Sequence, residues 1–209
     1  MQIESLESVI SAFILLTAFT FLMQNRIHNL INTFIWQSVL LTLATLLQAI
    51  NLQNTELYIS TALIFSLKVI TIPYLLKRFA TKLDIRRKVA VINHPFLLLL
   101  GAAFLVLFCY HLLGHNVLAV AMAVTLLGML LLITHHKAMA HVIGFMSMEN
   151  GIFFAALVAT HGMPMTVELG ISFDVLIAVI LFGIFFLQLR RSIDSLDVDR
   201  LNLLRENKE

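Results

Sequence analysis

GFMSMENGIFF, residues 144–154, lies in the middle of a run of apolar residues and carries a single acid, Glu149. The whole run covers residues 138–160, which is long enough for an α-helix to cross the hydrocarbon core of a membrane. An ionised carboxylate is costly at the centre of a bilayer, and an ionisable residue within a span usually faces other protein or water. This stretch therefore predicts a membrane helix that buries an acid near its midpoint.

The composition of the whole chain favours a membrane protein. Of its 209 residues, 60% are hydrophobic and only 12% are charged, whereas soluble domains carry about 25% charged residues. The single cysteine, Cys109, excludes an intramolecular disulfide and a multi-cysteine metal site built by this chain alone. A formal charge of +2 is too small to suggest nucleic-acid binding. The acidic N-terminus lacks the basic segment and cleavage site of a signal peptide, so we expect an uncleaved first span.

Seven apolar stretches, each of about 20 residues, predict seven transmembrane helices in an all-α integral membrane protein. We place these helices at about 4–23, 29–50, 56–76, 94–113, 116–134, 138–160 and 167–189. The connections between them are short, and the one longer polar connection covers residues 77–88. We expect no separate soluble domain, because no connection is long enough to form one.

The lysine and arginine residues predict how the chain is oriented. Of the 14 lysine and arginine residues, all except Lys68 lie in connections, or in the C-terminal tail, that seven spans would place on the same side. Positively charged connections stay in the cytoplasm. We therefore expect a multi-pass protein of a bacterial or archaeal cytoplasmic membrane, with its N-terminus outside and its C-terminus in the cytoplasm.

Weak internal similarity predicts a duplication. ELYIS at 56–60 recurs as ELGIS at 168–172, and the same offset of 112 residues aligns Gln37 with Glu149. We expect a parallel repeat of two three-helix units joined by a linking helix. The first unit with its basic cytoplasmic loop would cover 1–88, the linking helix 89–115, and the second unit with the cytoplasmic tail 116–209.

Away from the ends of the predicted spans, three charged residues lie in their interiors: Lys68 in the third, Glu149 in the sixth and Asp174 in the seventh. Such residues mark ion or proton paths by default, and they can instead form a structural pair that fixes how helices pack. His141, two turns before Glu149, is a further candidate for a proton path. The other histidines fall at predicted connections or span ends, and no spacing resembles a metal or haem site.

Pro73 follows Lys68 by five residues and affects the same span. Because proline has no N–H, it removes the hydrogen bond to the carbonyl of Val69 and predicts a kink just beyond the lysine. The chain also lacks a phosphate loop, a dinucleotide fingerprint and a nucleophile elbow. We therefore expect a noncatalytic component of a larger assembly, with no cofactor of its own.

Four motifs resemble component E of the membrane arm of hydrogenase-4 and formate hydrogenlyase. They are FSLKVITIP at 65–73, MENG at 148–151, ISFDVLIAVI at 171–180 and SLDVDRLNLL at 195–204. The last three spans, ending in LQLRRSIDSLDVD at 187–199, are also similar to subunit K of NADH–quinone oxidoreductase and to the related C subunit of multisubunit cation/proton antiporters. In that alignment the second-helix glutamate of the subunit K family falls at Met146, one turn before Glu149. The third-helix glutamate falls about one turn after Asp174.

The resemblance implies a noncatalytic membrane subunit of a complex-I-like hydrogenase. It would contribute to proton translocation or energy coupling, with Glu149, Asp174 and Lys68 on a lateral proton path. It would pack against other membrane subunits, including antiporter-like ones, and nickel–iron and iron–sulfur centres would belong to partner subunits. Two alternatives stay open, a structural scaffold subunit without a relay role and a subunit of a cation/proton antiporter-like or inorganic-carbon uptake complex.

Overall fold

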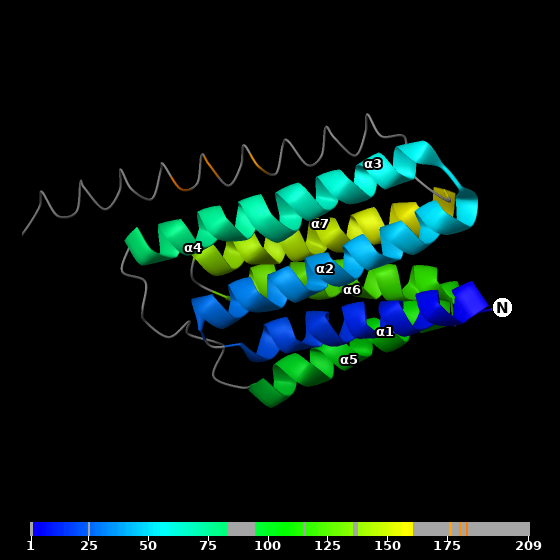
Figure 1. Cartoon of the computed structure of the whole chain (residues 1–209). Helices are drawn as coiled ribbons and strands as arrows, with labels where there is room; N and C mark the ends of the chain where they lie inside the picture. Colours follow the sequence, from blue (N-terminus) through cyan, green and yellow to red (C-terminus); the bar gives the residue numbers. More distant parts are fainter. Residues whose placement is uncertain are drawn as a thin grey trace, which may run out of the picture.

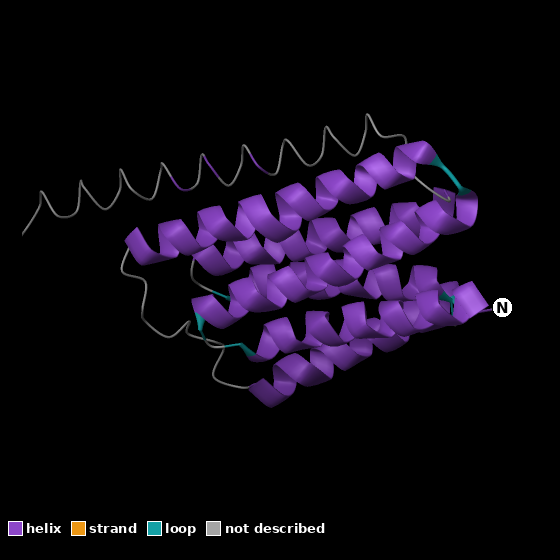
Figure 2. Ribbon diagram, in the orientation of Figure 1, coloured by secondary structure: helices purple, strands orange, loops and turns teal. Residues whose placement is uncertain are grey.

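The computed structural model describes residues 2–24, 26–82, 95–114, 116–135 and 138–160, together with positions 176, 180 and 183. Within these residues every regular element is helical and there is no strand (Figure 2). The elements are α1 (Gln2–Met23), α2 (Ile27–Leu52), α3 (Thr55–Ile64), η1 (Phe65–Thr71), α4 (Ile72–Lys82), α5 (Pro95–Leu113), α6 (Val117–Thr134) and α7 (Ala138–Thr160). Here η1 is a π-helical segment, and α3, η1 and α4 follow one another without a break.

By length and composition, six helical segments of the described chain can cross a membrane. They correspond to six of the seven predicted spans, so the expectation of a multi-pass, all-helical membrane protein is confirmed in this coarser form. The seventh predicted span, 167–189, lies outside the described residues except at positions 176, 180 and 183. Of these, Gly183 is buried, and a Cβ added there would meet the ring of Phe79 on α4. Seven spans and the internal repeat stay predictions.

One predicted boundary was wrong. The polar connection was placed at residues 77–88, but α4 continues through Lys77 and Arg78 and ends at Lys82. A helix can extend beyond the apolar core in this way because long basic side chains place their charged ends in the headgroup region while their stems cover apolar surface.

The spans form one bundle in which successive segments run in opposite directions (Figure 1). α6 and α7 form the most extensive pair, α1 packs against α2 and α6, and α2 packs against α3 and α7. α5 lies at the side of the bundle, against α6 and α1. The pairs α1–α6 and α2–α7 each join helices that the predicted repeat would make equivalent.

Apolar side chains cover the outside of the bundle as well as its core. Leu30, Ile31 and Phe34 of α2 are fully buried, whereas Trp36 of the same helix is 66% exposed. Phe104 and Leu107 of α5 are similarly exposed. A soluble protein rarely exposes so much apolar area, but lipid tails solvate such a surface well.

Glycines bring α6 and α7 close together. A Cβ added at Gly128 would lie 2.5 Å from the backbone nitrogen of Met148, and one at Gly151 would lie 2.5 Å from Oγ1 of Thr125. Small residues at helix contacts allow backbones to approach in membranes, where no hydrophobic force drives helices together. Packing one face of α7 on α6 leaves another face, with Glu149 and Asn150, directed toward α2 and η1.

Candidate functional site

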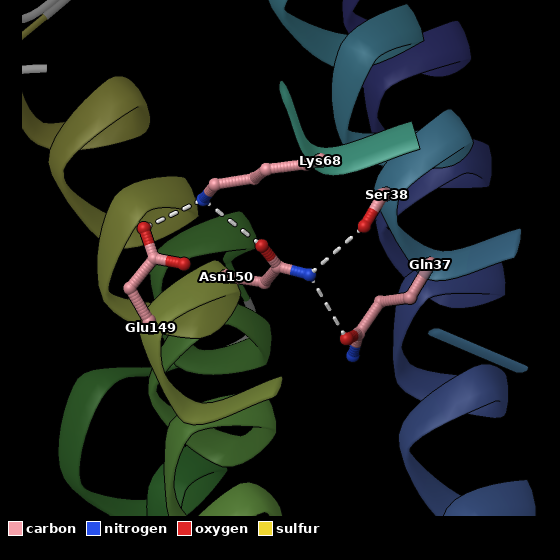
Figure 3. A network of polar contacts seen from close by, with 5 residues as sticks. All are labelled: Gln37, Ser38, Lys68, Glu149 and Asn150. Atoms are coloured by element: carbon pink, nitrogen blue, oxygen red, sulfur yellow. Dashed lines mark hydrogen bonds and ion pairs between the residues drawn. The ribbon is translucent and has the colours of Figure 1, made fainter. Parts of the chain in front are cut away.

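Lys68 and Glu149 form a buried ion pair in the interior of the bundle (Figure 3). The ammonium Nζ of Lys68 donates a hydrogen bond of 2.6 Å to Oε1 of Glu149 and one of 3.0 Å to Oδ1 of Asn150. It also lies 5.2 Å from the ring centroid of Phe153, close enough for a cation–π interaction. Lys68 is 1% exposed and Glu149 is 7% exposed. The positive charge therefore has an acid, an amide oxygen and an aromatic face as neighbours, which offsets part of its desolvation cost.

The π-helical turn explains why Lys68 faces the interior. Ile64, Lys68, Ile72 and Leu76 are all buried, at a regular spacing of four residues. A straight α-helix has about 3.6 residues per turn and would rotate such a series progressively away from the core. The wider turn of η1, in which the N–H of Ile72 bonds the carbonyl of Leu67, compensates for this rotation. Lys68 and Leu76 thus stay on the same face as Ile64.

Pro73 comes directly after this wide turn. The sequence predicts disruption just beyond Lys68, whereas the π-helical segment begins at Phe65 and includes the lysine itself. A wider turn relieves the clash between a proline ring and the carbonyl four residues earlier, which is a known cause of local helix distortion. π-Helical turns occur frequently at functional sites.

Asn150 connects the ion pair to α2. Its Nδ2 donates a hydrogen bond of 3.2 Å to Oε1 of Gln37 and a longer one of 3.4 Å to Oγ of Ser38 (Figure 3). All of these side chains are buried. The network thus joins η1, α7 and α2. Gln37 is also the residue that the predicted repeat aligns with Glu149, and the two belong to one network.

Glu149 is only half satisfied. Its Oε1 accepts the lysine bond, but its Oε2 is buried and makes no hydrogen bond to any residue that the structure describes. A buried carboxylate oxygen without a partner is costly, and such exceptions in native proteins call for an explanation. In chemical terms, one oxygen faces a proton donor and the other is available to exchange a proton with a second group.

The other predicted site residues have different positions. His141 lies on α7, eight residues before Glu149 and so roughly 12 Å along the helix axis, and it is exposed. Asp174 lies outside the described residues. Within the described ranges no group of three His, Cys, Asp or Glu residues could hold a metal ion.

Sequence reasoning named Lys68 and Glu149, but it missed Phe153 and Ser38. Phe153 follows Glu149 by four residues and therefore lies on the same helix face, a spacing that is visible in the sequence. Ser38 precedes Asn150 by 112 residues, so the repeat offset that aligned Gln37 with Glu149 also identifies it.

A groove lies elsewhere, between α1, α5 and α6, with a volume of about 470 Å³. Its lining includes Ser8, Ser11, Phe19, Tyr110 and Val120. None of the charged residues of the network lines it, so the groove and the ion pair are separate features.

Comparison with known proteins agrees with the resemblance seen in the motifs. The chain is 27% identical over 160 residues to Hydrogenase-4 component E of Escherichia coli K12, covering 72% of this chain and 74% of the relative. It is 29% identical over 192 residues to the uncharacterized protein Rv0085 of Mycobacterium tuberculosis, covering 86% and 87% of the two chains. No protein-family model matches the chain, and no solved structure matches it. The similarity is to a hydrogenase-4 membrane component, and the resemblance to subunit K stays a prediction.

Proposed function

We propose that this chain is a noncatalytic membrane subunit of a complex-I-like hydrogenase of the hydrogenase-4 type. Its similarity to Hydrogenase-4 component E over most of both chains supports this assignment. It would pack against other membrane subunits, including antiporter-like ones, in a cytoplasmic membrane with its C-terminus inside. The nickel–iron and iron–sulfur centres of the redox reaction would be held by partner subunits.

We further propose that Lys68 and Glu149 contribute to proton translocation or energy coupling in that assembly. The observation that carries this proposal is the 2.6 Å hydrogen bond between two ionisable groups buried in the middle of their spans. Transfer of a proton from Nζ to Oε1 would convert the ion pair into a neutral amine and a neutral carboxylic acid. The net charge of the pair is zero before and after this step, so it avoids the cost of leaving a lone charge in a medium of low dielectric constant.

The carboxyl group can then exchange protons with two different groups, one through each of its oxygens. Its Oε1 faces the lysine, and its Oε2 is buried with no hydrogen-bond partner among the described residues. A proton that arrives at or leaves from Oε2 would therefore be exchanged on the side away from Lys68. Asp174, in the predicted seventh span, and His141, toward the N-terminal end of α7, are the further candidates for groups on this path.

A structural role is the competing explanation, and the same contacts favour it in part. The ammonium group of Lys68 makes hydrogen bonds to Glu149 and Asn150 and a cation–π contact with Phe153. A pair that only fixes helix packing would require such contacts. Removing one partner of a buried pair costs about 3–5 kcal/mol, whereas removing both is often neutral. This difference separates the two explanations experimentally.

The first test is Glu149→Gln, with the exposed Glu56→Gln at the start of α3 as the matched control. Assembly of the complex would be followed on native gels, and proton uptake coupled to hydrogen turnover would be measured in membrane vesicles. Glutamine keeps an oxygen that can accept the hydrogen bond from Lys68 but leaves its charge unpaired, so we expect a reduced yield of assembled complex. Because glutamine cannot carry a proton, the coupled turnover of the complex that does assemble should fall by on the order of tenfold or more. An assembled Glu149→Gln complex with coupling equal to that of Glu56→Gln would contradict the relay role.

The second test combines Lys68→Met with Glu149→Gln. Lys68→Met alone leaves a buried carboxylate without its cation, so we expect poor assembly, and the double variant should recover assembly by removing both charges. A relay predicts that the recovered complex still fails to couple proton movement to turnover. If the double variant recovers coupling together with assembly, the pair is structural.

A further inference from the structure

The buried face of α2 is polar in one half of the membrane and apolar in the other. From the middle of α2 to its C-terminal end, five of the eight buried side chains are polar, namely Gln37, Ser38, Thr42, Thr45 and Gln48, and the other three are Leu41, Ala44 and Ala49. In the N-terminal half they are Ile27, Leu30, Ile31 and Phe34. Fully buried polar side chains are unfavourable within a membrane protein unless they bind one another, backbone or water. Their segregation into one half of a single helix therefore requires a reason beyond packing.

The neighbouring helix α3 continues this polar surface. Ser60 and Thr61 of α3 are buried, and α3 packs against α2 in the antiparallel direction (Figure 1). Counted from the turn at Gln53, Ser60 and Gln48 lie a similar number of residues into their helices, so they have a similar depth in the membrane. We call the set Gln37, Ser38, Thr42, Thr45, Gln48, Ser60 and Thr61 the α2–α3 polar stripe.

Several atoms of this stripe lack partners. Nε2 of Gln37, Oε1 of Gln48 and Oγ of Ser60 are buried and form no hydrogen bond within the described chain. Buried polar atoms are normally satisfied, and an ordered water typically serves about three of them. The amide of Gln37 also belongs to the network that holds Lys68, so these atoms lead toward the ion pair.

The threonines of the stripe can accept hydrogen bonds. The hydroxyls of Thr42, Thr45 and Thr61 each donate to the carbonyl one turn earlier, at 2.8, 2.9 and 2.7 Å. A hydroxyl that donates to backbone keeps lone pairs with which it can accept a bond from water. Along α2 the stripe thus offers acceptors at every turn between the network and Gln48.

The dimensions fit a path through one half of the membrane. Gln37 and Gln48 are eleven residues apart, or roughly 16 Å along the helix, compared with about 30 Å for the whole hydrocarbon core. In the opposite half, the interior next to the network is closed by Ile72, Leu76, Ile143 and Met146, all fully buried. Buried apolar side chains such as Leu41, Ala49 and Leu57 also lie in the half that holds the stripe. The two halves of α2 therefore differ in their buried polar side chains, which lie toward one membrane face and are absent from its buried residues toward the other.

We propose that the α2–α3 polar stripe is a water-filled path that gives the Lys68–Glu149 pair access to protons from one membrane face only, the face at which α2 ends. In the predicted orientation this is the external face. The inference deepens the proposed function and rests on it for its role in coupling. The path itself is a property of the chain that can be measured without hydrogen turnover.

Accessibility of introduced cysteines tests the path directly. In a Cys109→Ser background, Thr45→Cys and Gln48→Cys place thiols in the stripe, and Ile31→Cys and Phe34→Cys place matched buried thiols in the apolar half of α2. Membrane vesicles that contain the full complex, in either orientation, would be exposed briefly to Ag⁺, a small thiol reagent that travels in water. Thiols left unreacted would then be labelled with a maleimide after denaturation.

We expect Ag⁺ to abolish most labelling of the two stripe thiols in right-side-out vesicles, and to leave the two thiols of the apolar half unchanged from either face. Stripe thiols that stay fully labelled by the maleimide in both orientations would overturn the path. An Ile31→Cys thiol that reacts with Ag⁺ as completely as the stripe thiols would overturn it too. This readout involves no hydrogen turnover. If Ag⁺ does not reach the stripe thiols, the proposed path is refuted but the proposed function is not, because the Glu149→Gln result decides the function separately.

A pair of conservative variants links the path to coupling. Thr45→Val keeps the shape of the side chain but removes its hydroxyl, whereas Thr45→Ser keeps the hydroxyl. In assembled complexes we expect Thr45→Val to lose several-fold in proton-coupled turnover and Thr45→Ser to retain it. Equal coupling in the two variants would overturn the role of the stripe in supplying protons.

Discussion

The close contact between α6 and α7 gives the sharpest quantitative prediction, for Gly151→Ala. A Cβ at this position would lie 2.5 Å from Oγ1, 2.6 Å from the backbone nitrogen and 2.9 Å from Cα of Thr125. Two of these atoms belong to the backbone of α6, so a side-chain rotation cannot relieve the clash. The two helices must move apart, or α7 must rotate.

The size of the effect follows from this geometry. Carbon atoms pack best at about 3.5–4.0 Å, so the helices must separate by roughly 1 Å locally, and a gap of that size forfeits a quarter to a half of the attraction in each neighbouring contact. Overpacking of this kind costs about 1–3 kcal/mol, and the better helix propensity of alanine returns about 1 kcal/mol at most. With the full propensity gain, a net loss of up to about 2 kcal/mol is expected. Glu149 and Asn150 directly precede Gly151, so the shift should also weaken their bonds to Lys68.

The single cysteine provides the assay. Cys109 is buried in α5, so a dye that fluoresces on reaction with thiols reports unfolding of the purified protein in detergent as temperature rises. For a chain of this size, 1 kcal/mol corresponds to a change in Tm of about 2–4 °C. Gly101→Ala is the matched control, because an added Cβ there meets nothing within 4 Å. Gly101→Ala should therefore raise Tm slightly, while Gly151→Ala lowers it.

Equal Tm values for the two alanine variants would refute the reasoning. They would mean that α7 does not approach α6 at Gly151 as closely as the structure places it. The orientation of Glu149 toward η1, which depends on that packing, would then lose its support.

The remaining predictions use the same thermal assay or a simple reporter. Gln53 has a φ of 50°, which is strained for a residue with a side chain. Gln53→Gly should therefore raise the free energy of unfolding by up to about 1 kcal/mol. A lower Tm for this variant would argue against the left-handed turn between α2 and α3. Asn150→Leu removes a hydrogen-bond partner from the buried Lys68 and from the buried Gln37, so it should lower the free energy of unfolding by about 1–3 kcal/mol. Ser38→Ala should cost less, because the bond that it removes is long and weak at 3.4 Å. A larger loss for Ser38→Ala than for Asn150→Leu would show that Asn150 does not bridge the network. Reporter fusions after residue 88 and after residue 209 should both give cytoplasmic signals, since basic connections stay inside, and a periplasmic signal from either would contradict seven spans.

The polarity of the candidate site was only partly visible in the sequence. Lys68 and Glu149 stand out because charges are rare inside apolar runs, and this contrast is local. Gln48 and Ser60 do not stand out, because uncharged polar residues are common in spans and can face lipid headgroups, other helices or water. Their significance depends on burial and on the absence of partners in the described fold, which are properties of the packed bundle.

The amino-acid pattern alone was enough to predict a multi-span helical membrane protein and the places of most of its spans. The reason is that backbone groups in lipid must bond within their own segment, so any sufficiently long apolar run becomes a helix whatever surrounds it. Which face of each helix is buried became visible only in the packed bundle. In a membrane both the core and the lipid-facing surface are apolar, so the hydrophobic pattern that orients helices in soluble proteins carries little information. For this reason the pairing of Lys68 with Glu149, 81 positions apart, and the difference between Gly151 and Gly101 emerged only from the packed helices.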